Sequence, residues 1–160
     1  MPIVAENLGV ITPEVDALRA RHKIPGMVVL QFDVVDDNLD LHTIPQNSVC
    51  YTGTHDNDTT VGWFLGSHDD IRSGDEIRNT QQAVLQLTDG TAATVHTDLI
   101  RAAFSNDAKL DISPLQDYLG LGSEARINIP GTSSNNWRWR VKEEQLDNGV
   151  RDLVANLVSA

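Results

Sequence analysis

Basic residues, aromatic residues and long apolar runs are all scarce in this sequence. Its 160 residues contain 12 Lys and Arg against 23 Asp and Glu, which gives a formal net charge of −11. That negative field repels phosphate backbones and argues against nucleic acid as a partner. No run approaches the ~20 apolar residues of a membrane span, and the first residues lack the basic and apolar regions of a signal peptide. We therefore expect a cytoplasmic protein that binds neither membrane nor nucleic acid.

Cysteine is almost absent, since Cys50 is the sole thiol. One cysteine cannot form an internal disulfide, and it is compatible with a reducing compartment. The composition is 40% hydrophobic and 22% charged, as in an ordinary globular protein. The length suffices for one domain with a real core, so we treat residues 1–160 as a single domain.

Strand-like apolar runs alternate with helix-like segments along the chain. The expected strands are residues 3–5, 27–32, 49–51 and 110–115. The expected helices are residues 11–22, 73–87, 93–104 and 143–158, the last with an apolar stripe at helical spacing. This alternation indicates parallel βα units and therefore the α/β class.

Two of the expected helices carry start signals. Thr12 suits an N-cap position and Pro13 the first helical position. Ser73 and Glu76 have the spacing of a capping box, in which each side chain bonds the other residue's backbone.

Polar residues follow each expected strand and are candidates for one site. In parallel α/β folds the chemistry gathers at the carboxyl ends of the strands, which places Glu6, Gln31, Asp56 and Gln116 on one rim. A lone Glu6 is also compatible with an ordinary surface acid. Because it follows an apolar run, its carboxyl can lie against apolar walls, where desolvation favours the protonated form that a general acid needs.

The stretch SVCYTGTHDNDTT places His55, Asp56 and Asp58 just after an apolar run. They are possible metal ligands, but no second histidine lies four residues away and Cys50 lies inside the expected strand, so the metal signal is weak. Asp and Asn also turn chains and cap helices. The third interpretation is binding and electrostatic control of a polar substrate.

The stretch SSNNWRWR combines aromatic and amide groups, a mixture that suits sugars because ring faces stack on aromatic rings while amides bind hydroxyls. The alternative is a core pair, Trp137 and Trp139, with arginines reaching past it to solvent. GLGSEARINIPG lacks the spacing and the Lys of a phosphate loop, and no G-x-S-x-G elbow is present. These absences argue against a nucleotide-binding protein and an α/β-hydrolase.

A family resemblance follows from four segments in order: AENLG, PGMVVLQF, YTGTHDNDTT and LQDYLGLGSEARINIPGTSSNNWRWR. Together they resemble the C-terminal part of the 4-α-glucanotransferases, the amylomaltases or disproportionating enzymes of the α-amylase superfamily. The resemblance covers roughly residues 2–141. It implies a (β/α)₈ barrel, a retaining double displacement on α-1,4-glucans such as maltooligosaccharides, starch or glycogen, and no cofactor or metal.

The same resemblance implies roles for five residues. Glu6 corresponds to the general acid/base, and Asp56 to the carboxylate that stabilises the transition state. His55 corresponds to a sugar contact at the cleavage point. Asn7 and Asn128 are similar to further substrate contacts.

The sequence departs from the family pattern at two points. Position 7 is usually Asp in the family and is Asn here. The family's nucleophile is an Asp in an Arg-x-Asp motif at the end of the fourth strand, and this sequence contains no such motif. A barrel takes at least ~200 residues. We therefore expect the C-terminal half of a barrel, strands five to eight with their helices, without transglycosylation activity of its own.

Two alternatives from other classes remain open at this stage. The chain can be a noncatalytic α-glucan-binding module, or a half-barrel that pairs with a second chain. It can also be a metal-dependent hydrolase built on His55, Asp56 and Asp58.

Overall fold

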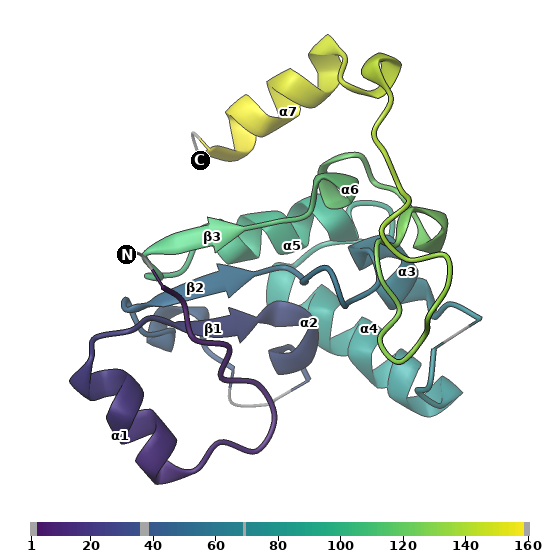
Figure 1. Ribbon diagram of the computed structural model, residues 1–160. Helices are drawn as coiled ribbons and strands as arrows, with labels where there is room; N and C mark the ends of the chain where they lie inside the picture. Colours follow the sequence, from purple (N-terminus) through teal and green to yellow (C-terminus); the bar gives the residue numbers. More distant parts are fainter. Residues whose placement is uncertain (1–2, 36–38, 69, 159–160) are drawn as a thin grey trace.

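The sheet lies at the centre of the molecule. The structure is a computed structural model that describes residues 3–35, 39–68 and 70–158. In these ranges three parallel strands form one sheet in the order β1 (Gly26–Val29), β2 (Ser48–Tyr51), β3 (Leu110–Ile112). All three arrows point the same way in Figure 1, so the carboxyl ends of the strands share one edge. The predicted α/β class with parallel strands is confirmed.

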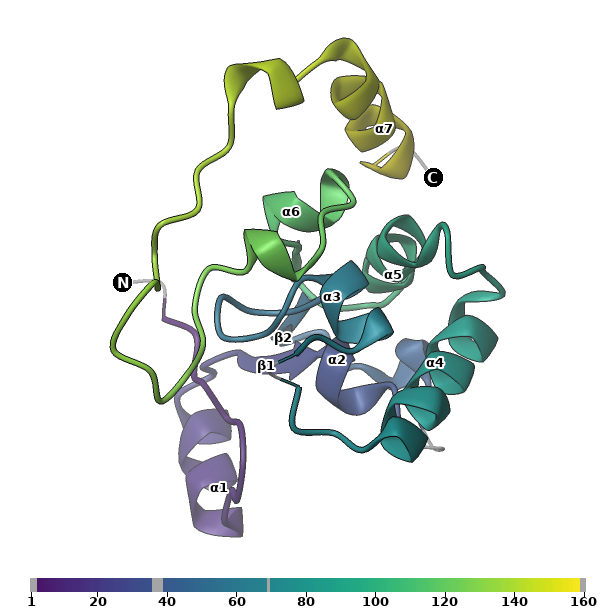
Figure 2. The same cartoon turned by 90° about the vertical axis from the view of Figure 1, so that its right-hand side faces the viewer.

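Helices surround this sheet unevenly. They are α1 (Pro13–Arg21), α2 (Leu30–Asp33), α3 (Thr60–Leu65), α4 (Gly74–Thr88), α5 (Val95–Phe104), α6 (Leu115–Tyr118) and α7 (Asn148–Val158), with 3-10 turns at Leu41–Thr43, Ser123–Ala125 and Glu143–Gln145. Helices α4 and α5 cover one side of the sheet, while α1 and α7 lie at opposite ends of the molecule (Figures 1 and 2). None of the described helices is both long and apolar enough to cross a membrane.

The core lies between the sheet and the helices α3, α4 and α5. Its fully buried side chains include Leu30 after β1, Cys50 in β2, Val84 in α4 and Leu99 in α5. Burial and the nearby Asp111 raise the pKa of the Cys50 thiol to about 12, so the thiol stays protonated at neutral pH. Cys50 is therefore a core residue and neither a nucleophile nor a metal ligand.

The helix start signals have different outcomes. Ser73 Oγ accepts from the Glu76 N–H at 3.2 Å and Glu76 Oε2 accepts from the Ser73 N–H at 2.7 Å, which confirms the capping box of α4. Pro13 begins α1 as predicted, but the Thr12 side chain forms no capping hydrogen bond there. The N-cap position of Thr12 is therefore confirmed, although its side chain does not bond the helix backbone.

The strand predicted at residues 3–5 is wrong. Within the described residues 3–35, no strand precedes Gly26. The segment meets the start of β1 through the Ala5 N–H, which donates to the Pro25 carbonyl at 2.8 Å. Further along, the Met27 N–H donates to the Asn7 side-chain oxygen at 2.6 Å. A side chain thus takes the donor that a backbone ladder needs.

Two other predicted strands are too long. β1 ends at Val29 rather than at residue 32, because Leu30 begins α2 and its carbonyl accepts from the Val34 N–H at 2.9 Å. β3 ends at Ile112, and Pro114 then becomes the N-cap of α6. Residues 36–38, which follow α2, lie outside the described part.

The C-terminal helix begins later than predicted, and α3 was not predicted. Residues 143–158 divide into a 3-10 turn and α7, because the Asp147 carboxylate accepts from the Val150 N–H at 3.0 Å and starts a new helix. Helix α3 begins directly after the His55–Asp58 stretch, where Thr59 caps it by accepting from the Gly62 N–H.

Candidate functional site

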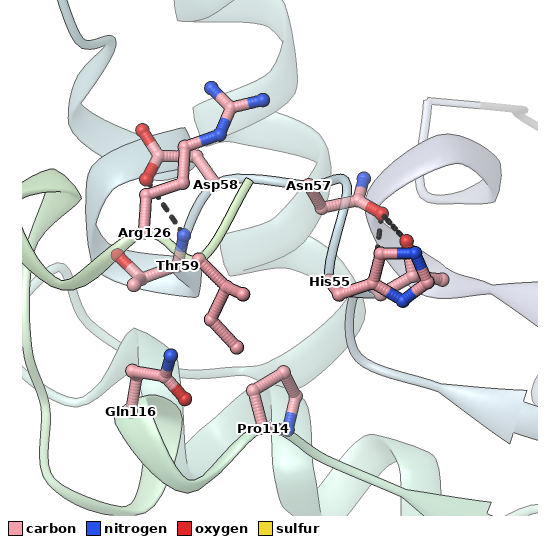
Figure 3. A pocket seen from close by; sticks show the side chains of 9 residues that line it. His55, Asn57, Asp58, Thr59, Pro114, Gln116 and Arg126 are labelled. Atoms are coloured by element: carbon pink, nitrogen blue, oxygen red, sulfur yellow. Dashed lines mark hydrogen bonds between the residues drawn. The ribbon is translucent and has the colours of Figure 1, made fainter. Parts of the chain in front are cut away.

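The loop between β2 and α3 carries the densest set of predicted site residues. It turns through Thr54 and Asn57: the Asn57 side-chain oxygen accepts from the Thr54 N–H at 2.9 Å and from the Thr54 hydroxyl at 2.8 Å (Figure 3). Asp58 accepts from the Thr59 N–H at 2.8 Å and from the Ser123 hydroxyl at 2.6 Å. These residues form the turn, as polar loop residues commonly do.

Asp56 is held from the segment that follows the 3-10 turn at Ser123–Ala125. The Asn128 side-chain nitrogen donates to Asp56 Oδ1 at 2.6 Å. Arg126 Nη2 donates to the Asp56 carbonyl at 2.8 Å, and Arg126 Nε donates to the Asn128 carbonyl at 2.9 Å. The structure therefore brings together Asp56 and Asn128, which are 72 residues apart in the sequence.

His55 lies beside Asp56 and next to an aromatic ring. Its Nε2 is 3.4 Å from Asp56 Oδ1, and the two side chains are 56% and 50% exposed. The Trp137 ring centroid lies 5.1 Å from the His55 ring centroid at an interplanar angle of 42°. Exposed polar groups beside a tryptophan suit a ligand with both hydroxyl groups and apolar ring faces.

A cavity of about 700 Å³ connects these residues with the N-terminal segment. Glu6, His55 and Asp56 all line it, together with Trp139. The rest of its wall is mainly apolar and includes Phe32. Glu6 itself is exposed, although apolar side chains line the same cavity. The volume lies within the range of small-molecule sites.

Asn7 is placed differently from its neighbour Glu6. Its side-chain oxygen accepts the Met27 N–H, and it is not among the described side chains that line this cavity. The structure therefore shows Asn7 as a tether between the N-terminal segment and β1. Its role as a substrate contact stays a prediction.

Gln31 and Gln116 lie at the carboxyl edge, as predicted, but both are almost fully buried and hold the backbone. Gln31 Nε2 donates to the Asp58 carbonyl at 3.1 Å, and Gln116 Nε2 donates to the Ala125 carbonyl at 3.1 Å. Gln116 also lines a small pocket of about 10 Å³, which has room for about one water molecule (Figure 3). These amides support the loops around the site.

A metal-dependent hydrolase would need a cluster of metal-ligating side chains within residues 3–35, 39–68 and 70–158. No group of three or more His, Cys, Asp or Glu side chains that could hold a metal ion lies there. Asp58, the third ligand of that alternative, has both carboxylate oxygens engaged by Thr59 and Ser123.

Four residues near the site were not assigned from the sequence. Arg126 belongs to the same R-I-N-I-P-G motif as Asn128, so the motif itself was an available signal. Trp139 was weighed as a core residue, yet it is half-buried and lines the cavity, and Trp137 is 56% exposed. Asp117 is fully buried beneath the loop, and no local pattern marked it.

The fold and the cavity define an α/β protein whose candidate site opens at the carboxyl edge of a parallel sheet, where such folds place their ligands. The family model described as 4-alpha-glucanotransferase matches residues 1–146. The chain therefore belongs to the 4-alpha-glucanotransferase family, as the resemblance predicted.

Individual relatives agree with this assignment. The 4-alpha-glucanotransferase of Synechocystis is 48% identical over 151 residues, which cover 92% of this chain and 28% of the relative. That of Thermus thermophilus is 42% identical over 159 residues, which cover 94% of this chain and 31% of the relative. The chain also superimposes on the amylomaltase of Streptococcus agalactiae in complex with acarbose, with a TM-score of 0.86 and 26% identity, over 99% of this chain and 31% of that one.

The chain thus spans less than a third of the length of these relatives.

Proposed function

We propose that this chain supplies the acid/base and the transition-state-stabilising carboxylate of a 4-α-glucanotransferase that transfers α-1,4-glucan segments between maltooligosaccharides. The observation that carries the proposal is the single cavity lined by Glu6, His55 and Asp56 in a chain of this family. Two carboxylates at one cavity, at the carboxyl edge of a parallel sheet, provide an acid/base and a group that stabilises positive charge, two of the three carboxylates of this chemistry.

Glu6 acts first as the acid. It protonates the glycosidic oxygen as the bond from that oxygen to the anomeric carbon breaks, while an Asp nucleophile forms a bond to the same carbon. In the second step Glu6 takes the proton of an acceptor sugar's hydroxyl, whose oxygen displaces the nucleophile. Retaining enzymes place acid/base and nucleophile ~5–5.5 Å apart. No Arg-x-Asp motif in the 160 residues provides this nucleophile.

Asp56 stabilises the positive charge that develops on the sugar ring. A carboxylate does this best when its position is fixed before the reaction, since no reorganisation is then needed. The hydrogen bonds from Asn128 to its carboxylate and from Arg126 to its carbonyl provide that fixation. His55, which lies on the same cavity, contacts the sugar at the cleavage point.

In this proposal the chain corresponds to strands five to eight of a (β/α)₈ barrel, with the remaining strands elsewhere in the complete enzyme. The described residues form three of these four strands, β1 to β3, and residues 3–5 correspond to the fifth barrel strand without forming one here. Two observations support this correspondence. The three parallel strands place their polar loops at one edge, as barrel strands do. The chain also covers 28% of the Synechocystis relative, a share too small for a complete barrel with its loops.

Reconstitution tests the proposal. The chain would be co-expressed with the part of the Synechocystis relative that precedes the matched region, and maltotriose would be the substrate. We expect longer maltooligosaccharides from the pair and none from the chain alone. Longer maltooligosaccharides from the chain alone would contradict the proposal that the chain provides no nucleophile.

Site variants assign the roles within the reconstituted enzyme. Glu6→Gln and Asp56→Asn should each reduce transfer by roughly a hundredfold or more, the scale of a lost acid/base or electrostatic group. Asp75→Asn is the matched control, because its carboxylate is 82% exposed on α4, away from the cavity. Equal losses in all three variants would count against the assigned site.

A noncatalytic glucan-binding module is the second candidate, favoured by the exposed Trp137 beside His55. Calorimetry with acarbose separates the two. Binding by the chain, without transfer in any reconstituted pair, would favour the module.

A further inference from the structure

We propose that Asp117 is a positioning residue: it closes the loop that carries His55 and Asp56 by binding both of its ends with one carboxylate. This inference deepens the proposed function and rests on it, because His55 and Asp56 are the groups presented to the sugar. Asp117 lies in α6, is 1% exposed, and does not itself line the cavity.

The Asp117 carboxylate joins Thr52, at the start of the loop, to Thr60, at its end. Asp117 Oδ2 accepts from the Thr52 hydroxyl at 2.8 Å and from the Thr60 hydroxyl at 2.9 Å. Asp117 Oδ1 accepts from the Thr60 N–H at 2.8 Å. Thr52 and Thr60 are both completely buried. One carboxylate therefore fixes the separation between the end of β2 and the start of α3.

A carboxylate suits this position because three donor groups of two residues, Thr52 and Thr60, donate to it. An ionised carboxylate only accepts, and here both of its oxygens have donors. Burial raises the pKa of Asp117, and the Thr60 and Thr52 donors oppose that effect. The Thr60 N–H is also the first amide of α3, where negative charge interacts favourably with the helix dipole.

Asp117 is itself fixed from the packed side of the molecule. His96 Nδ1 on α5 lies 2.8 Å from the Asp117 carbonyl, and the Asp117 N–H donates to the Pro114 carbonyl at 3.0 Å. Gly120 has a φ of +60°, and a Cβ there would lie 3.1 Å from the His96 ring. The buried core helix α5 thus holds α6, and α6 holds the loop through Asp117.

The loop has further contacts, but each of them holds one part of it. Arg126 and Asn128 hold Asp56 in the middle of the loop. Backbone hydrogen bonds join Thr52 to Gln31 and to Ile112 at the β2 end. Gln31 and Ser123 both hold Asp58, near the α3 end. His55 and Asp56 lie in the exposed middle, where Arg126 and Asn128 fix Asp56 locally, while the two ends set where this middle lies relative to the sheet. Loss of the Asp117 carboxylate should remove the contact that joins the two ends to each other.

Hydrogen exchange measured by mass spectrometry tests this in the full chain. For Asp117→Ala we expect amides in residues 53–60 to exchange roughly tenfold faster or more, the scale of a lost hydrogen bond to a charged group. Residues of α5 should keep their wild-type rates. Asp117→Asn should show a smaller increase, because its amide can accept from the Thr60 N–H and donate to both hydroxyls.

The matched control is Val84→Ala, which removes a fully buried side chain from α4 in the core. It should raise exchange across the core without singling out residues 53–60. If Asp117→Ala changed the loop no more than this control does, the proposal would be overturned. If Asp117→Ala failed to fold, Thr52→Val would replace it, since it removes one of the three donors and leaves the carboxylate. Unchanged loop exchange in Thr52→Val would likewise overturn the proposal.

Acarbose binding, followed by calorimetry, separates this inference from the proposed function. If the wild-type chain binds acarbose, Asp117→Ala should bind it at least about tenfold more weakly, and Asp117→Asn should recover most of the affinity. Equal affinity in wild type and Asp117→Ala would overturn the positioning role. If the wild type bound no acarbose while the exchange pattern appeared as expected, the loop-closing role would stand and the glucan site would fail.

Discussion

Helices α5 and α1 have nearly the same length, 10 and 9 residues, but they stand in opposite relations to the fold. Six residues of α5 are buried, and the helix packs against α3, α4, α6, α7 and β3. In α1, none of the described residues 13–21 is buried, and Leu18 is 57% exposed. One helix is part of the core, and the other lies on the outside of the molecule (Figure 2).

Asp56 and Glu6, the two catalytic candidates, differ in the same way: one is connected to the core and the other to the outside of the molecule. Asp56 lies on a loop whose ends are fixed, through Asp117 and His96, by α5. Glu6 lies on the segment that leads into α1, and Asn7 is its nearest side-chain tether to the sheet. The core of this chain therefore positions Asp56, whereas few contacts hold the segment that carries Glu6.

The largest expected effect comes from truncating matched leucines in the two helices. Leu99→Ala in α5 leaves a cavity in the core and should lower the free energy of unfolding by about 2–5 kcal/mol. Leu18→Ala in α1 should change it by no more than about 0.5 kcal/mol, because the side chain is already exposed. Urea unfolding followed by circular dichroism measures both. Similar losses of stability in the two variants would contradict the distinction between α5 as a core helix and α1 as a surface helix.

A smaller effect is expected at the tether of the Glu6 segment. Asn7→Ala removes the acceptor of the Met27 N–H and should cost about 1 kcal/mol. Asn7→Asp keeps an acceptor oxygen at the same place and is the matched control. Exchange of the Met27 amide should accelerate in the alanine variant and stay close to wild type in the aspartate variant. An unchanged amide in Asn7→Ala would show that other contacts hold the segment.

The smallest effect concerns pH and the Asp70–Arg72 pair. Arg72 donates to both Asp70 carboxylate oxygens, which lowers the pKa of Asp70. A lowered pKa contributes stability above the ordinary Asp pKa, near ~3.9, and the contribution disappears as pH falls through the folded-state value. Asp70→Asn should therefore cost about 1 kcal/mol or less at pH 7 and nothing in strong acid. Thermal unfolding across this pH range measures the difference, and a cost that persisted in acid would contradict the ion-pair explanation.

Sequence patterns predicted the packed side of the molecule better than its edges. The capping box of Ser73 and Glu76 was found because its partners are three residues apart, within reach of a local rule. The strand expected at residues 3–5 was wrong because apolar residues do not decide pairing: Asn7 occupies the Met27 donor instead. Helix α3 was missed because its start depends on Thr59 and on the distant Asp117.

At the candidate site too, sequence patterns identified residues but not the contacts between them. Motifs located Glu6, His55, Asp56 and Asn128, and the family match supports that resemblance. No pattern predicted that Asn128 donates to Asp56, or that Trp139 lines the cavity. Contacts across such separations depend on how loops return over the sheet.

The sequence by itself determined the α/β class, the family and the residue types available for chemistry, because these follow from periodicity and from motifs of neighbouring residues. The tertiary structure decided which of those residues meet. Asp117 illustrates the reason: it lies 65 residues from Thr52 and 57 from Thr60, and only folding places its carboxylate between them. Burial there makes hydrogen-bond partners necessary, since a carboxyl group in the core is costly unless its polar atoms are paired.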